Sequence, residues 1–220
     1  MTTEIVLAVI VFGALAFVGA ELFTRGWLAR RGRPYTWAPW TRTRLILDRE
    51  TLPTLEPVVE HRINGDGERG DPVPEDRQGL FRVLVVGGSA AECWFLDQQS
   101  SWPHVLQQTL RQPENLRRLG ARNVHVGNIA RSLVAARHID TVLERILPHY
   151  EHLDAIVFMV GASDIVHWLE KGTPTVIDDV LPTNMLFAQH PDGPFGWGPR
   201  TLALRRIASA WRHRVQNPGP

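Results

Sequence analysis

The chain has 220 residues, 44% of them hydrophobic and 21% charged, and its formal net charge is +1. This length accommodates one domain of about 150 residues with accessory segments, and the near-neutral charge argues against a protein that binds nucleic acid through its overall field. The single cysteine, Cys93, excludes an internal disulfide. We expect no metal and no cofactor, because no set of His, Cys, Asp or Glu has ligand spacing and no glycine-rich phosphate-binding loop occurs.

The first predicted element is a transmembrane helix over residues 1–24. Residues 5–20 carry no charge and no strongly polar group, and with their flanks they reach the roughly 17–20 residues that a bilayer-spanning helix needs. A cleaved signal peptide is the alternative, but such a peptide begins with basic residues, and residues 1–4 contain none. We therefore predict an uncleaved, single-pass anchor in the inner or cytoplasmic membrane.

Basic residues are distributed asymmetrically around this segment. No lysine or arginine precedes it, and four arginines follow it: Arg25, Arg30, Arg31 and Arg33. Because loops rich in lysine and arginine stay in the cytoplasm, this asymmetry predicts an external N-terminus and a cytoplasmic domain.

Residues 25–80 are rich in proline, glycine and arginine. We interpret them as a stalk that wraps onto the domain, because the short apolar patches at residues 45–47 and 58–59 need burial. The glycines and aspartate within residues 64–70 are typical of turns.

Residues 81–171 alternate between predicted strands and helices. Predicted strands cover residues 81–86, 123–126 and 155–160, and predicted helices begin at Trp102, capped by Ser101, and cover residues 134–147. Continuous apolar strands in a βαβαβ order indicate a parallel sheet covered on both faces. The expected fold class is therefore α/β, a three-layer arrangement with a mostly parallel sheet, truncated at the C-terminus and preceded by one transmembrane helix.

Residues 172–220 form the last predicted segment. A loop over residues 172–198 precedes a basic amphipathic helix over residues 200–214. A helix that docks on the domain with a solvated basic face is one interpretation, and a helix that binds a membrane surface or a partner is the other.

The most informative stretch joins the first core strand to a serine. Gly87, Gly88 and Ser89 follow that strand directly, and small turns at the carboxyl ends of parallel strands are where α/β folds place their chemistry. Together with Leu96-Asp97 and Ser101-Trp102-Pro103, this pattern resembles the SGNH (GDSL-like) hydrolases. The resemblance covers residues 64–168, and residues 64–70 are similar to the lead-in of membrane-anchored members. It implies an SGNH or flavodoxin-like sheet, a serine esterase activity and, in contrast to the charge asymmetry, a periplasmic or other extracytoplasmic domain.

The resemblance assigns roles to individual residues, and most of the assigned positions have changed. Ser89 matches the nucleophile. Ala130 and Leu133 replace the two glycines of the second motif, and Ser163 replaces the oxyanion asparagine of the third, which ends at Asp164. Ala130 and Ser163 are therefore degenerate oxyanion positions.

The final Asp-x-x-His motif of the family is expected after further strands and helices, and the sequence ends at Pro220 without them. Asp164 and His167 have this spacing, but they follow the third strand, where a helix should begin, rather than a late loop that faces the serine. Because losing a general base costs orders of magnitude in rate, we interpret Ser89 as a vestige.

The predicted function is that of a non-catalytic accessory subunit on a degenerate SGNH-like domain. Its expected partners are the lipid bilayer and other membrane subunits, contacted through the N-terminal helix and the domain, with a respiratory or photosynthetic energy-transducing complex as the class of assembly considered. Two alternatives stay open. In the first, the chain is an active serine esterase or acyl-ester hydrolase whose C-terminal Asp-x-x-His segment is missing from this sequence. In the second, it is a non-catalytic module that binds a ligand.

Overall fold

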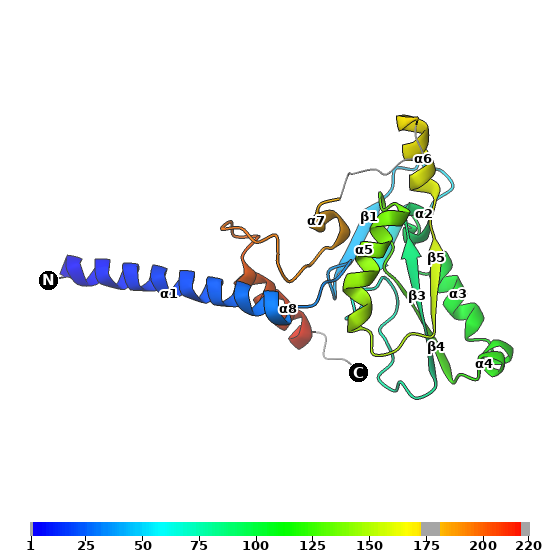
Figure 1. Cartoon of the computed structure of the whole chain (residues 1–220), viewed down its shortest axis with the longest axis horizontal. Coiled ribbons are helices and arrows are strands. Elements are labelled where there is room, and N and C mark those ends of the chain that lie inside the picture. The colour runs from blue at the N-terminus through cyan, green and yellow to red at the C-terminus, as the bar shows by residue number, and fades with distance from the viewer. Residues whose placement is uncertain (1, 173–180, 217–220) are drawn as a thin grey trace. The chain divides into compact units, whose positions relative to one another are not determined.

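The structure is a computed structural model, and it describes residues 2–172 and 181–216. The chain divides into two compact units, residues 1–34 with 189–220, and residues 35–188. The structure confirms the α/β class, the parallel pairing of the core strands and the single apolar N-terminal helix (Figure 1).

The first unit is built on helix α1 (Thr2–Arg31). Its stretch Thr3–Arg31 is long and apolar enough to cross a membrane. Side chains from residue 3 to residue 20 are exposed, whereas Glu21, Thr24 and Leu28 are buried on one face. This face meets the C-terminal segment, which ends in helix α8 (Ala203–Gln216). The predicted helix over residues 200–214 therefore exists, shifted by two or three residues.

Glu21 joins the two helices of this unit. Its carboxylate accepts the backbone N–H groups of Ala203 at 2.8 Å and Leu204 at 3.0 Å, and the Nε of Arg25 donates to it at 2.9 Å. The first N–H groups of a helix have no partner within the helix, so a carboxylate there satisfies them and favours the positive end of the helix dipole. Glu21 thus fixes the start of α8 against α1.

The second unit contains a three-stranded parallel sheet in the order β4-β3-β5. The central strand β3 (Leu80–Gly87) pairs with β4 (Asn123–Asn128) on one side and with β5 (Ala155–Met159) on the other. The three strands predicted from apolar runs are therefore present, each with bounds that differ by one or two residues. Their continuous apolar character is explained by burial on both sides of β3.

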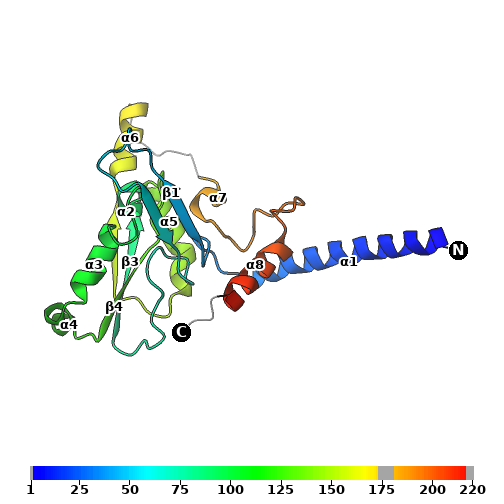
Figure 2. The ribbon, with the colours of Figure 1, turned by 180° about the vertical axis from the view of Figure 1, so that it is seen from behind.

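The side chains of β3 alternate between two hydrophobic clusters. Val83 and Val85 pack with strand β4 and with the helices α3 (Trp102–Leu110) and α4 (Pro113–Leu119). Leu84 and Val86 pack with α5 (Ala136–Ile146) and with α7 (Thr183–Leu186). Figures 1 and 2 show α3 and α5 on different sides of the strands, so the helices that connect the strands also cover them.

Two details of the predicted helices are wrong. Ser101 is the residue before α3, but its hydroxyl donates to the Gln98 carbonyl at 2.8 Å and does not cap the helix. Helix α5 begins at Ala136 rather than at residue 134 because Ala135, the residue before it, is extended, with φ −90° and ψ 167°. A short 3-10 turn, Leu147–His149, follows α5.

The segment before β3 contains a hairpin that the sequence analysis did not predict. Strand β1 (Arg42–Ile46) pairs antiparallel with β2 (Val58–Arg62). Isolated bridges then join Arg69 to Ile63 and to Asn128, so residues 63–69 reach the end of β4.

The edge of the sheet formed by β5, together with the helix that follows it, leaves apolar side chains exposed. Strand β5 pairs with β3 alone among the described residues, and helix α6 (Ala162–Lys171) follows it. The exposed apolar side chains of this region are Phe158, Met159, Val160, Ile165, Val166, Trp168 and Leu169. Part of the predicted loop over residues 172–198, namely 173–180, lies outside the described residues.

Candidate functional site

Ser89 lies where the sequence analysis places it, directly after the central strand. It begins the short helix α2 (Ser89–Glu92), and its side chain is exposed. The preceding turn requires glycine at residue 87, because a Cβ there would lie 2.2 Å from the Met159 carbonyl oxygen. The Ser89 hydroxyl has no hydrogen bond to any residue that the structure describes. Its proton therefore has no acceptor in this part of the chain.

The ends of the three parallel strands bring the other predicted site residues to the same edge. The Gly88 N–H donates to the Met159 carbonyl at 3.3 Å, and the Arg131 N–H donates to the Gly87 carbonyl at 3.1 Å. A Cβ on Gly88 would lie 3.5 Å from Ser163 Oγ. Ser89, Ala130 and Ser163 are thus neighbours at the carboxyl edge, where the strand order reverses and α/β sheets bind ligands.

Ala130 is the position at which the SGNH pattern predicts a backbone oxyanion donor. Its N–H instead donates to Asn128 Oδ1 at 2.9 Å, and Asn128 Nδ2 donates to the Ala91 carbonyl at 2.8 Å. The Ala130 carbonyl accepts the indole N–H of Trp37 at 3.2 Å. Because the Ala130 N–H already donates to Asn128, this N–H is not directed at an oxyanion that would develop beside Ser89.

Asp164 caps a helix. Its two carboxylate oxygens accept the Ala136 N–H at 3.1 Å and 3.0 Å, at the first residue of α5. Among the described side chains, no histidine donates to Asp164. The side chain of His167, the other half of the Asp-x-x-His spacing, is not among those that the structure describes.

The loop after Ala130 keeps an unusual backbone shape. Leu133 has a φ of 68° and its side chain is 64% exposed. A β-substituted residue in this left-handed region is strained, whereas glycine occupies it freely. Next to Leu133, Ser132 donates its N–H, at 2.6 Å, and its hydroxyl to the buried carboxylate of Glu92. The hydrogen bonds of Ser132 to Glu92 therefore hold this loop, although leucine is poorly suited to the backbone conformation at residue 133.

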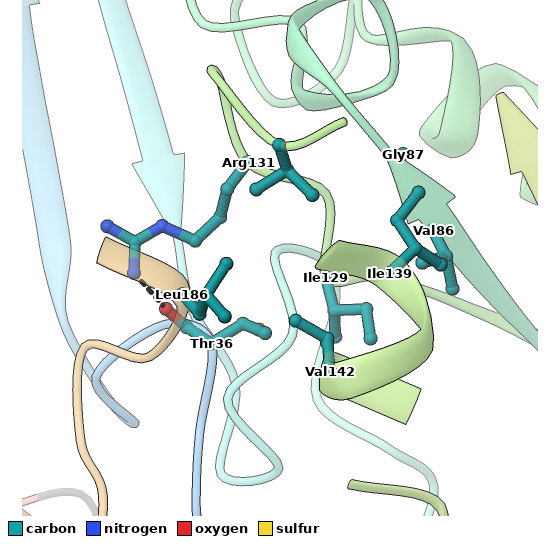
Figure 3. Close-up of a pocket in the computed structure, with 9 residues that line it drawn as sticks. Thr36, Val86, Gly87, Ile129, Arg131, Ile139, Val142 and Leu186 are labelled. Atoms are coloured by element: carbon teal, nitrogen blue, oxygen red, sulfur yellow. Dashed lines mark hydrogen bonds between the residues drawn. The ribbon is translucent and has the colours of Figure 1, made fainter. Parts of the chain in front are cut away.

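A very small cavity lies beside Gly87, two residues before Ser89. Its volume is about 10 Å³ (Figure 3). Figure 3 shows Arg131 crossing it to donate to the Thr36 carbonyl, at 3.1 Å. Its lining residues are Thr36, Val86, Gly87, Ile129, Arg131, Val134, Ile139, Val142 and Leu186. A cavity of this volume is at the lower limit for one water molecule, so it accommodates no acyl chain.

The largest concentration of buried charge lies elsewhere, at the fully buried carboxylate of Glu68. Its Oε2 accepts from His125 Nε2 and Asn64 Nδ2, each at 2.9 Å, and its Oε1 accepts from Arg82 Nη2 at 3.0 Å and from the Tyr150 hydroxyl at 2.8 Å. We call these five residues the Glu68 cluster. Asp66 adds a second carboxylate, 2.6 Å from Arg82 Nη2.

The protonation behaviour of the Glu68 cluster follows from its pairing. Burial alone would raise the pKa of Glu68, but the hydrogen bond and charge of His125, together with the charge of Arg82 and the Asn64 amide, lower this pKa to about 2. Burial and the adjacent Glu68 charge raise the pKa of the Tyr150 hydroxyl well above its usual value. Glu68 is therefore ionised and Tyr150 is neutral at physiological pH.

Space for the Glu68 carboxylate depends on Gly127 of strand β4. A Cβ on Gly127 would lie 2.3 Å from the carboxyl carbon of Glu68. Arg69, the next residue along the chain, is also buried. Its guanidinium donates to the carbonyls of Glu92, Cys93 and Leu96, the last two at 2.9 Å and 2.7 Å. Residues 68 and 69 thus hold the sheet on one side and the loop after Ser89 on the other.

Sequence reasoning missed the Glu68 cluster, although one indication was present. His125 interrupts an apolar strand as Val124-His125-Val126. A polar side chain inside a strand that is buried on both faces needs a partner, and the acidic residues of the 64–70 segment are the candidates. The described residues include no group of three or more His, Cys, Asp or Glu able to hold a metal ion.

Two comparisons with known proteins found no match to this chain. No protein-family model matches the chain, and a search of curated proteins finds no significant match.

Proposed function

We propose that the chain is a single-pass membrane protein whose domain follows the SGNH-hydrolase plan without its catalysis, and that it serves as a structural accessory subunit of a larger membrane complex. The domain stands on the cytoplasmic side in this proposal, because the arginines that flank the apolar helix all follow it. A respiratory or photosynthetic complex is the class of assembly to which such a subunit would belong.

One observation carries the non-catalytic part of the proposal. The groups that would assist a serine esterase at this edge are engaged in holding the backbone. The Asp164 carboxylate caps α5, and the Ala130 N–H is bonded to Asn128. A serine esterase needs a base to accept the hydroxyl proton and aligned donors for the oxyanion, whereas the Ser89 hydroxyl has no hydrogen-bond partner among the described residues and the Ala130 N–H is already bonded.

The strand order supports the SGNH-like plan. A central first strand flanked by the second and third, with its connecting helices on both sides, is the start of a doubly wound, three-layer sheet. The uncovered apolar side chains of β5 and α6 support an accessory role, because contiguous exposed apolar side chains mark contact surfaces.

A serine esterase is the second candidate, and one observation favours it. Ser89 is exposed at the switch point of the sheet, and Ser163 lies beside the preceding residue, Gly88. A histidine and an aspartate supplied by a further segment could reach this hydroxyl, and the same surface would then hold an acyl ester.

A pair of measurements on the full chain in mild detergent tests the proposal. We expect hydrolysis of p-nitrophenyl acetate and butyrate no faster than with a Ser89→Ala variant, and no labelling of Ser89 by a fluorophosphonate. Stoichiometric labelling would establish the esterase instead. We also expect the protein to be extracted from its native membrane with other subunits, and its recovery as a monodisperse monomer would overturn the accessory role.

A further inference from the structure

Helix α8 has two chemically different faces. Its exposed apolar side chains are spaced four residues apart, which places them on one side of a helix: Ile207 is 39% exposed, Trp211 68% and Val215 58%. Arg205, Ser209 and Arg212 lie on the other side and are exposed. Helix α8 contacts α1, and Glu21 accepts the first N–H groups of α8, but Ile207, Trp211 and Val215 keep exposed apolar surface.

The attachment to Glu21 sets the depth of α8 along α1. Side chains from residue 3 to residue 20 are exposed and almost all apolar, and Glu21 is the first buried residue after them. About twenty residues at ~1.5 Å each match a hydrocarbon core of roughly 30 Å. The remaining ten residues of α1 then extend about 15 Å further at ~1.5 Å each, which is more than the roughly 5–8 Å that the headgroup region adds on each side of the core. Helix α8 starts beside Glu21, the residue at which the hydrocarbon core would end (Figures 1 and 2).

Exposed tryptophans gather in the same unit, outside the continuous apolar run. They come from α1, from the loop before α8 and from α8 itself: Trp27, Trp197 and Trp211. Arg25 fixes the loop, since its guanidinium lies 4.7 Å from the Trp197 ring centre and donates to the Gly196 carbonyl at 2.7 Å. Tryptophan is enriched where a bilayer meets water, because its ring is apolar and its N–H is polar.

We propose that α8 lies at the interface of the bilayer that α1 crosses, with Ile207, Trp211 and Val215 turned toward the lipid and the neighbouring arginines on anionic phospholipid headgroups. This inference rests on the proposed membrane anchoring of α1. Arg200 and Arg212 are exposed and take part in no hydrogen bond or ion pair with the described residues, so both are available to phosphate groups. A helix with an apolar face, aromatic residues and a basic face is the usual form of an interfacial anchor.

The test places an environment-sensitive NBD fluorophore on single cysteines of the full chain in a Cys93→Ala background, reconstituted into phosphatidylcholine nanodiscs with 0–50 mol% phosphatidylglycerol. Labels at Phe12, Trp211 and Ser209 report on α1, on the apolar side of α8 and on its polar side. We expect a blue-shifted spectrum and quenching by lipid-borne doxyl groups at residues 12 and 211. We expect the label at residue 209 to stay quenched by aqueous iodide.

The phosphatidylglycerol dependence tests the arginines. Replacing Arg200 and Arg212 by glutamine should reduce the equilibrium between the embedded and exposed label at residue 211 by about fivefold for each arginine. An Arg117→Gln, Arg118→Gln variant removes the same charge from α4, where both side chains are exposed, and should behave like the parent chain.

Three results would overturn the inference. A label at residue 211 that stays in water while the label at residue 12 is in lipid would reject the surface helix and leave the membrane anchor intact. A label shielded equally at all lipid compositions, without doxyl quenching, would identify a protein contact instead. Exposure of residue 12 to iodide would reject the anchor, and with it both proposals.

Discussion

Glu68 is a carboxylate with four hydrogen bonds and no exposure to solvent. Burying a charge costs several kcal/mol unless partners surround it, and removing one partner leaves the others exposed to that cost. His125 and Arg82 are buried with it, and the Nδ1 of His125 and the Nε of Arg82 have no hydrogen-bond partner in the part of the chain that the structure describes. The hydrogen bonds and ion pairs with the Glu68 carboxylate therefore provide most of the stabilisation of His125 and Arg82 in this buried site.

Replacing Glu68 by glutamine should lower the free energy of unfolding by about 3–5 kcal/mol at pH 7. The substitution removes the negative charge, and the NH₂ group of the glutamine amide would face side chains that themselves donate hydrogen bonds. The loss should depend on pH. The pKa of Glu68 is about 2 in the folded state and near 4.5 when unperturbed. Its stabilisation is therefore complete above pH ~4.5 and is lost as the pH falls toward 2.

The measurement is thermal unfolding of both proteins at several pH values. The difference between parent and variant should shrink on acidification, and a difference independent of pH from 6 to 2.5 would contradict the pairing. Glu144→Gln, at an exposed position of α5, is the matched control and should change the stability by less than about 0.5 kcal/mol.

Leu133 gives a prediction of opposite sign. Its φ of 68° suits glycine, and its exposed side chain contributes little burial. We expect Leu133→Gly to stabilise the protein by about 1 kcal/mol. Leu133→Ala removes the same side chain but keeps the Cβ, so it should give no such gain. Equal effects of the two changes in a thermal melt would show that backbone strain is not the cause.

At the scale of elements, the carboxylate of Glu21 acts as the cap of α8. Glu21→Ala should free the N–H groups of Ala203 and Leu204, at a cost of about 1 kcal/mol to the start of this helix. Amide hydrogen exchange should become faster at residues 203–206 and stay unchanged in α5. Glu4→Ala, near the exposed start of α1, is the control, and protection at residues 203–206 that survives Glu21→Ala would contradict the capping role.

The elements that could be predicted are those with a strong local pattern. Continuous apolar runs located β3, β4 and β5, and an apolar stripe located α8. The hairpin of β1 and β2 escaped because β1 reads Arg-Thr-Arg-Leu-Ile, and the strands are joined by eleven residues instead of a recognisable two-residue turn. Its stability comes from tertiary contacts that no local pattern encodes.

The candidate site shows the same division. The strand ends could be predicted to bring Ser89, Ala130 and Ser163 together, because parallel strands share a carboxyl edge. The hydrogen bond between Asp164 and Ala136 could not be predicted, since it depends on where α5 begins, and α5 begins only after the extended Ala135. The Glu68 cluster unites residues from four separate segments of the chain, so only the folded structure assembles it.

For the whole molecule, residues 35–77 are part of the domain's core. Removing residues 1–77 deletes Glu68 and Arg69, leaves His125 and Arg82 buried without their carboxylate, and releases the loop after Ser89. We expect this shortened chain to aggregate. The unit of residues 35–188 retains both residues and should remain soluble, and a cooperative melt of a monomeric chain starting at residue 78 would contradict the prediction.

The Glu68 contacts also set a sequence of events in folding. Glu68 meets His125 across 57 residues and Tyr150 across 82. Long loops close at an entropic cost, so such contacts form late. The carboxylate leaves the ribosome before either partner exists, and it stays hydrated until strand β4 and the turn after α5 have been synthesised. Completion of the core therefore waits for the last third of the chain, and until then the apolar strands depend on chaperones or on rapid synthesis to avoid aggregation.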